Sequence, residues 1–174
     1  MKKELSSAED RREVQSIGVL APLRHPDVSD CLRRLMDFAL TKGINLRFEE
    51  HLLSNSLEDV ILLEFDAEPV DLLIALGGDG TLLRAGRLAA GRGVPVLGIN
   101  IGHLGFLTAL RHQEMEDRLT LVLEGNYVLD RRSMLEAHIV GPDGTHGDRL
   151  LAWNDFVIHK RGVARVTRLD LCVQ

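Results

Sequence analysis

The segment VDLLIALGGDGTLLRAGRLAAG, from Val70 to Gly91, decides the fold class of this chain. Its first seven residues, Val70 to Leu76, are nearly all apolar, which is typical of a strand covered on both faces of a sheet. The stretch from Thr81 to Gly91 has the spacing of a helix. The segment therefore predicts a buried strand, a glycine-rich turn and a helix, in that order.

The same alternation of strands and helices surrounds this segment. The spacing from Val28 to Gly43 predicts a helix with an apolar stripe along one face, and the glycine is predicted to end it. The stripe consists of Leu32, Leu35, Met36, Ala39 and Leu40. Strands are predicted at Gln15–Leu23, Ile44–Glu50 and Val94–Asn100. The connection from Leu53 to Asp66 fits either a helix or an irregular segment. Together these elements predict a parallel α/β sheet, whose ligands bind beyond the carboxyl ends of the strands.

The pattern changes after a predicted helix from Arg111 to Leu123, which ends at Gly125. The remaining chain reads as β structure, with the turn-rich sequence GPDGTHG separating two strand-like stretches. These stretches are Tyr127–Val140 and Leu150–Lys160, and a third, Val166–Val173, alternates apolar and polar residues. We therefore expect an α/β nucleotide-binding domain at residues 1–124, followed by the beginning of an all-β, sandwich-like domain at 125–174.

The final predicted strand stops at Gln174 without a turn, a cap or a polar tail. A sheet that is left with an open edge is an unusual end for a domain. We therefore expect the chain to be cut short before the end of its second domain.

The composition excludes several functions. The formal net charge of -5 gives no general attraction to nucleic acid or to an anionic membrane. No leader-like or membrane-spanning apolar run occurs in the sequence, so a cytoplasmic protein is expected. Cys31 and Cys172 lack CxxC spacing and a histidine cluster, and this predicts reduced thiols rather than a disulfide or a zinc site.

The first candidate functional motif is the turn Gly77-Gly78-Asp79-Gly80-Thr81. Glycines at the end of a strand let backbone amides approach an anion, and the following helix presents the positive end of its dipole. Asp79 or Thr81 can cap that helix, and Arg84 lies one turn further on, where it can reach the same anion. On the pentapeptide alone, a phosphate loop and a plain strand-to-helix turn capped by Asp79 both remain open.

Two further segments of the sequence favour the phosphate loop over the plain turn. GGDGT resembles the loop shared by NAD kinases, diacylglycerol and sphingosine kinases, and phosphofructokinases. The glycine-studded block Leu97–Leu107 and the Asn154-Asp155 pair within Trp153–His159 resemble NAD kinases in particular, in the same order along the chain. The resemblance extends from about Ile17 to the last residue.

The resemblance implies transfer of the γ-phosphoryl group of ATP, or of inorganic polyphosphate, to the 2′-hydroxyl of the adenosine ribose of NAD. It implies Mg²⁺ or another divalent cation with the ATP, no protein residue assigned as a metal ligand, and a homo-oligomer for the full-length protein. Asp79 is implied as the proton acceptor, although a carboxylate with a pKa of ~3.9 is a weak base for an alcohol. Orienting the hydroxyl and accepting its proton late suits it better. The implied binding residues are Gly78, Asp79, Gly80, Thr81, Arg84, Asn100, Asn154, Asp155 and Arg165.

Some of these assignments have a structural alternative. Adjacent residues of a strand point to opposite faces, so Asn154 and Asp155 act together only if the pair sits at the start of the strand. Asp155 is also one methylene shorter than the usual glutamate. Arg165 fits either a ligand contact or an exposed strand position. His103 is expected to be structural.

Two other functions remain open. One is a lipid kinase of the diacylglycerol or sphingosine type, which shares GGDGT but leaves the other two blocks unexplained. The other is a truncated, non-catalytic nucleotide-binding module, which the abrupt end at Gln174 favours.

Overall fold

The computed structural model describes residues 13–22, 25–53, 61–63, 68–102, 105–108, 110–158 and 170–173. The chain divides into two compact units, Met1–Ser133 and Met134–Gln174.

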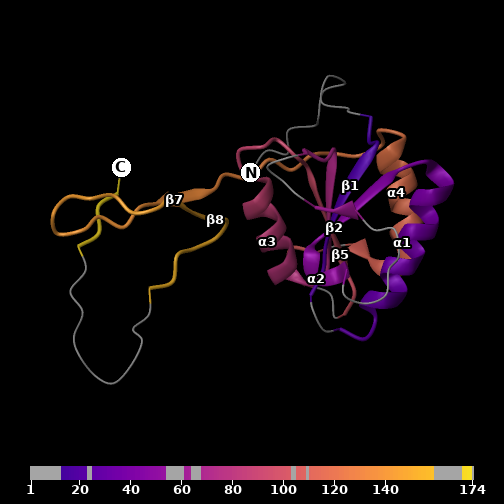
Figure 1. Cartoon of the computed structure of the whole chain (residues 1–174), viewed down its shortest axis with the longest axis horizontal. Helices are drawn as coiled ribbons and strands as arrows, with labels where there is room; N and C mark the ends of the chain where they lie inside the picture. The colour runs from indigo at the N-terminus through magenta and orange to yellow at the C-terminus, as the bar shows by residue number, and fades with distance from the viewer. Residues whose placement is uncertain are drawn as a thin grey trace. The chain divides into compact units, whose positions relative to one another are not determined.

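The first unit is built on a six-stranded sheet in which all the described strand pairs are parallel. The strand order is β3-β2-β1-β4-β5-β6 (Figure 1). The strands are β1 (Ser16–Leu20), β2 (Asn45–Phe48), β3 (Ile61–Leu62), β4 (Leu72–Leu76), β5 (Val96–Asn100) and β6 (Leu110–Arg111). This confirms the predicted parallel α/β sheet, and it places a short strand within the connection that the sequence left open.

Helices lie on both faces of this sheet. The helices are α1 (Val28–Lys42), α2 (Glu50–Leu53), α3 (Asp79–Ala89) and α4 (Met115–Leu123), with a 3-10 turn, η2 (His112–Glu114), before α4. In Figure 1, α1 and α4 lie on one side of the strands and α3 lies on the other. None of the helices within the described ranges is long and apolar enough to cross a membrane.

The predicted end of α1 is confirmed, but its predicted apolar stripe is wrong at one residue. Gly43 ends the helix in the left-handed conformation, with φ 68°, and its N–H donates to the last helical carbonyls. Leu40 is 83% exposed. At 100° per residue it lies roughly 80° around the helix from Leu32, which takes it past the edge of the buried face.

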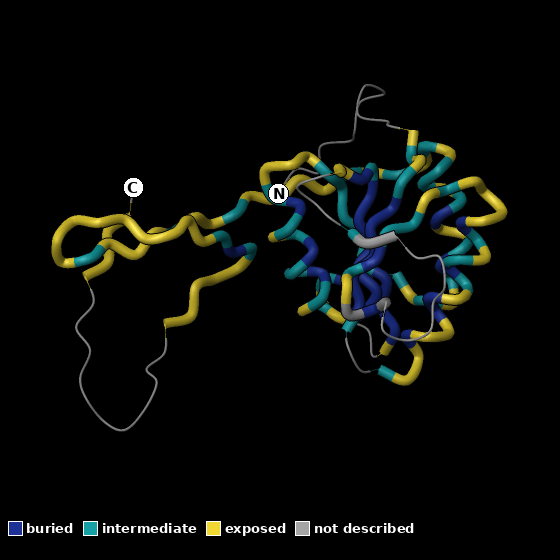
Figure 2. Tube along the Cα trace, viewed as in Figure 1, coloured by how far each residue is buried: buried dark blue, intermediate teal, exposed yellow. Residues whose placement is uncertain are grey.

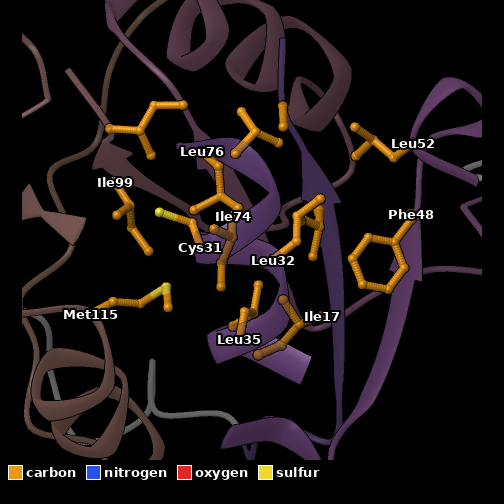
Figure 3. Packing of buried hydrophobic residues seen from close by; sticks show 14 of the residues in the cluster. Ile17, Cys31, Leu32, Leu35, Phe48, Leu52, Ile74, Leu76, Ile99 and Met115 are labelled. Atoms are coloured by element: carbon orange, nitrogen blue, oxygen red, sulfur yellow. The ribbon is translucent and has the colours of Figure 1, made fainter. Parts of the chain in front are cut away.

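The main core lies between the sheet and the α1–α4 pair. Alternate residues of the central strands point to this side, including Ile17 of β1, Ile74 and Leu76 of β4, and Ile99 of β5 (Figure 3). They pack with a helical set consisting of Cys31, Leu32, Leu35, Met115 and Leu119. Cys31 is thus a free thiol that fills a small position in the core.

Strand β4 is buried along its whole length, which explains its continuous run of apolar residues. On the other face of the sheet, α3 packs against β4 and β5. The buried residues of α3 are Leu82, Ala85 and Ala89. The glycine turn between β4 and α3 is therefore anchored on both sides by buried elements.

In the described part of the second unit, β7 (Leu135–Ala137) pairs antiparallel with β8 (Leu150–Ala152). A bridge between Val140 and His146 continues the hairpin. The antiparallel pairing was predicted, but both strands are much shorter than expected. Most of this hairpin is exposed (Figure 2), and two strands without a packed third one provide little cross-strand burial. The third predicted strand lies mostly outside the described residues, and 170–173 form no strand.

Candidate functional site

The sheet topology places a switch point beside the glycine turn. Strand β1 pairs with β2 on one side and with β4 on the other, so successive crossovers run in opposite directions from this point. In open parallel sheets, ligands bind at such a switch point, beyond the carboxyl ends of the strands. The residues Gly77–Thr81 follow the carboxyl end of β4, at this position.

Gly77 is a glycine because the fold requires it. Its φ is 155°, and a Cβ at this position would lie 2.3 Å from Oγ1 of Thr81. Its N–H donates to the carbonyl of Ile99, 2.8 Å away, and so links the turn to β5. The close approach of Thr81 to the backbone therefore makes the turn tight.

Gly78 and Gly80 are different, because the fold does not require a glycine at either position. Both residues are exposed, and a Cβ on either would meet no atom within 4 Å. Gly78 has an extended backbone with φ -95°, and Gly80 lies in the first turn of α3. The open space over these two residues is what a backbone that approaches an anion needs.

Helix α3 begins without a side-chain cap, so the predicted capping by Thr81 or Asp79 is wrong. The N–H groups of Thr81 and Leu82 donate instead to the carbonyl of Gly78, at 3.1 and 3.2 Å. The carboxylate of Asp79 does not cap the helix because it is turned to a different part of the chain.

That part is the segment 105–108, in the second glycine-studded block. Oδ2 of Asp79 accepts the N–H of Phe106 at 2.9 Å. Oδ1 accepts the N–H of Leu107 at 3.0 Å, together with the N–H and the hydroxyl of Thr108, both at 3.1 Å. Asp79 thus joins the glycine turn after β4 to the loop after β5.

These contacts set the charge state of Asp79. Its partial burial alone would raise the pKa of the carboxyl group. The N–H groups of Leu107, Thr108 and Phe106 and the hydroxyl of Thr108 outweigh that effect and lower the pKa below its ordinary value. Asp79 is therefore a firmly held carboxylate at neutral pH.

Asn100, one of the implied binding residues, has a buried side chain that contacts the loop after β5. Its Nδ2 donates to the hydroxyl of Thr108 at 2.9 Å, and its Oδ1 accepts the N–H of Gly102 at 2.8 Å. Asn100 and Thr108 are each 1% exposed. Asn100 therefore supports Asp79 through Thr108.

Arg84 lies on α3 as predicted, but its guanidinium group is engaged away from the glycine turn. It forms a two-bond ion pair with the carboxylate of Glu49, at 2.6 and 2.7 Å, and also donates to the carbonyl of Ala21 at 3.3 Å. These partners follow β2 and β1, so Arg84 connects α3 to the carboxyl ends of two neighbouring strands. Binding of an anion by Arg84 would compete with Glu49.

Phe106 was not singled out from the sequence as a functional residue. Its side chain is fully exposed while its N–H contacts Asp79. An exposed aromatic ring beside a candidate site offers a face on which a base can stack. The available signal was an apolar aromatic residue inside a glycine-rich segment, where no periodic core position was expected.

The remaining predicted site residues belong to the second unit. Asn154 and Asp155 are exposed and follow the end of β8, so they do not lie at the start of a strand. The alternation of strand side chains therefore does not restrict this pair. Arg165 and His103 lie outside the described residues.

A metal site built from protein side chains is not found in the described part of the chain, where no group of three His, Cys, Asp or Glu residues gathers. Asp79 is the described acid in the glycine turn, and its two oxygens already accept N–H and O–H donors.

The comparisons with known proteins agree with one another. A family model described as the ATP-NAD kinase N-terminal domain matches residues 17–127. The NAD kinase of Gemmatimonas aurantiaca is 38% identical over 157 residues, covering 90% of this chain and 54% of that protein. The NAD kinase of Syntrophotalea carbinolica is 36% identical over 162 residues, covering 92% and 56%. This chain thus spans about half the length of these curated relatives.

A solved structure has a similar fold. Yeast NADH kinase, crystallised with NADH, superposes with a TM-score of 0.74 over 83% of this chain and 48% of that one. The two sequences are 19% identical, so this likeness supports the architecture alone.

Proposed function

This chain belongs to the NAD kinase family, and we propose that it supplies the phosphate-loop half of an active site that makes NADP from NAD. In the proposed reaction, the 2′-hydroxyl oxygen of the adenosine ribose forms a bond to the γ-phosphorus of ATP, or to a terminal phosphorus of polyphosphate. The bond from that phosphorus to its leaving oxygen breaks, and the hydroxyl proton is released.

The observation that carries this proposal is the open backbone at Gly78 and Gly80. Neither glycine is needed for a left-handed conformation or for internal packing, yet both lie at the amino end of α3. The close approach of a ligand would explain why glycine occupies two positions at which the fold itself does not require it. Backbone N–H groups and the helix dipole favour a phosphate there.

Asp79 is proposed to orient the ribose hydroxyl. Phosphoryl transfer proceeds through a loose transition state, so positioning contributes more than strong base catalysis. The lowered pKa of Asp79 supports a hydrogen-bond acceptor that takes the proton late, when the hydroxyl has become acidic. Phe106 is proposed to pack against a base of the dinucleotide from the same loop.

Other residues complete the proposed binding surface. Gly80 contributes a backbone N–H group at the start of α3, Thr81 lies beside it in the same turn, and Asn100 acts through the loop after β5. Asn154 and Asp155 are proposed to contact the hydroxyls or base of NAD, and Arg165 is proposed to contact the ligand. Arg84 is proposed to bind the donor phosphates after its guanidinium leaves Glu49.

The divalent cation is proposed to arrive with the donor, held by phosphate oxygens and water, as Mg²⁺ commonly is. It would neutralise charge on the transferred group. The described side chains offer it no site, so we derive no step through it. A homo-oligomeric protein in the cytoplasm, without nucleic acid or membrane partners, completes the proposal.

The test uses the protein expressed from its gene to the natural stop codon, with NAD, ATP and Mg²⁺, and with NADP detected enzymatically. We expect NADP from the wild type and no turnover from Asp79→Asn, which should keep NAD affinity within several-fold. Phe106→Ala should fold normally and bind NAD about tenfold more weakly, the magnitude of one lost base–aromatic stack. Replacing ATP by polyphosphate in the same assay identifies the donor.

The same assay separates the competing functions. If no NADP forms while NAD still raises the melting temperature, the chain is part of a non-catalytic nucleotide-binding module. The family match gives no support to a lipid kinase, and phosphorylation of diacylglycerol without NADP formation would be required to revive that alternative.

A further inference from the structure

Thr108 is a buried polar residue beside the candidate site that the sequence did not indicate. It lies two residues before the start of β6 and eight residues after Asn100, and it is 1% exposed. Neither the parallel sheet nor the helices use its hydroxyl group. Its hydrogen bonds show what the hydroxyl group does.

The direction of the hydroxyl proton follows from the neighbours. The N–H of Gly102 donates to Oδ1 of Asn100 at 2.8 Å, which fixes the orientation of the amide and leaves Nδ2 to face Thr108. Because Nδ2 can only donate, the Thr108 oxygen must accept this bond. Its own proton is then available for Oδ1 of Asp79, 3.1 Å away.

The rest of the Thr108 side chain is also held. A Cβ on Gly98 would lie 3.0 Å from the Thr108 methyl group and 3.2 Å from Leu82, so the glycine of β5 makes room for this methyl. A Cβ on Gly105 would lie 2.8 Å from the Thr108 hydroxyl oxygen and 2.2 Å from Oδ1 of Asp79. The hydroxyl therefore sits in a confined position, and it cannot turn away from Asp79 without losing both packing and hydrogen bonds.

The two oxygens of Asp79 differ as a result. A carboxylate oxygen offers about two acceptor positions. Among the residues that the structure describes, Oδ1 receives three donors, two of them from Thr108, whereas Oδ2 receives one, from Phe106. The acceptor capacity that remains is on Oδ2.

We propose that Thr108 is a positioning residue for the phosphoryl transfer: it anchors Oδ1 of Asp79 so that Oδ2 is the oxygen that receives the ribose hydroxyl. This inference rests on the proposed function. It assigns contact with the ligand to Oδ2 of Asp79. Asn100 then acts indirectly, as the donor that aligns the Thr108 hydroxyl.

The first measurement is independent of catalysis. The carboxyl carbon of Asp79 is followed by NMR through an acid titration of the 174-residue chain, with Asp79→Asn to assign the signal. The described groups that contact this carboxylate carry no ionisable side chain, so its pKa reports the hydrogen bonds. Thr108→Val, which keeps the methyl and removes the hydroxyl, should raise the pKa of Asp79, and Thr108→Ser should leave it near the wild-type value.

The second measurement is steady-state NADP formation by the protein expressed to its natural stop codon. Thr108→Val should lower kcat about ten- to a hundredfold, the scale of a misplaced reacting group. The KM for NAD should change less than about threefold, and Thr108→Ser should restore most of kcat. If Thr108→Val does not fold, Thr108→Ser and Thr108→Ala form a second pair that differs by the hydroxyl alone.

The outcomes separate the two proposals. A raised pKa of Asp79 in the valine variant, with kcat lost and recovered by serine, supports the inference. An unchanged pKa of Asp79, or an unchanged kcat, overturns it. If the wild-type protein makes no NADP, the proposed function fails by itself, and the role of Thr108 in catalysis falls with it, while the titration still decides whether Thr108 anchors the carboxylate.

Discussion

Thr108 gives Asp79 two hydrogen bonds, one from its backbone N–H and one from its hydroxyl, and both end on the same carboxylate oxygen. The pair joins two loops that follow neighbouring strands, β4 and β5. Because the strands are parallel and adjacent, their carboxyl ends meet at one edge of the sheet. The glycine turn and the later glycine block are thus two parts of one local structure.

The first prediction concerns the space between these two parts. Gly105→Ala should destabilise the first unit by about 1–3 kcal/mol, because the new Cβ would lie 2.2 Å from Oδ1 of Asp79 and force the loops apart. Chemical denaturation measures the change. Gly78→Ala is the matched control, since its Cβ meets nothing within 4 Å, and its unfolding free energy should stay within about 0.5 kcal/mol of the wild type. Equal stability of the two variants would contradict the described packing.

The second prediction concerns the buried amide. Asn100→Ala removes the donor to the Thr108 hydroxyl and the acceptor for the Gly102 N–H, so it should cost about 1–3 kcal/mol of unfolding free energy. Asn126→Ala removes the same side chain at an exposed position and should cost less than about 0.5 kcal/mol. A small loss at Asn100 would mean that the amide does not hold the loop.

The third prediction tests whether Arg84 has more than a structural role. Arg84→Ala should lower the unfolding free energy by about 1–3 kcal/mol, because Glu49 is 17% exposed and loses a two-bond partner. Arg118→Ala breaks an exposed pair with Glu114 and should cost below about 0.5 kcal/mol.

Ligand binding by the same arginine gives the sharper result. If Arg84 leaves Glu49 to bind the donor phosphates, Glu49→Gln should raise ATP affinity several-fold and Arg84→Ala should lower it, both measured by calorimetry. Unchanged ATP affinity in both variants would restrict Arg84 to bracing α3 against the strands.

The fourth prediction concerns the loss of stability at acidic pH. The folded-state pKa of Asp79 is lowered, so the stability that its contacts provide is fully present above the unfolded value of ~3.9 and is lost as the pH falls through the folded value. The wild-type unfolding free energy should therefore fall from about pH 5 downward. Asp79→Asn should show a shallower fall over the same range, measured by urea denaturation at each pH. Parallel curves for the two proteins would mean that Asp79 is not held as described.

Much of the fold could be predicted because the signals were local. The unbroken apolar run of β4 and the glycine after α1 each have one dominant physical cause, namely burial on both faces and a left-handed helix end. The lengths of the hairpin strands were overestimated, because strand-like alternation in the second unit does not by itself provide a packed partner. The prediction that Leu40 belongs to the buried stripe was wrong for a related reason, since the width of a buried helical face depends on what packs against it.

The site was only partly visible in the sequence. GGDGT located the turn, but the partners of its aspartate lie 27 to 29 residues further along the chain. That separation explains why Asp79 was considered as a cap for its own helix, and why Thr108 and Phe106 were not singled out. The pairing of Arg84 with Glu49 depends on β2 lying two strands away from β4 in the sheet, which helix spacing cannot indicate.

The most direct test of the central claim, that the glycine turn is shaped for a ligand, is a paired measurement on Gly80→Ala. The position lies in the first turn of α3, and a Cβ there would meet nothing within 4 Å. The variant should therefore be as stable as the wild type or more stable by up to about 1 kcal/mol, because alanine favours a helix over glycine. Its affinity for NAD and ATP should nevertheless fall at least about tenfold, since the methyl group occupies the space that a phosphate needs. A variant that keeps both its stability and its full nucleotide affinity would contradict the account.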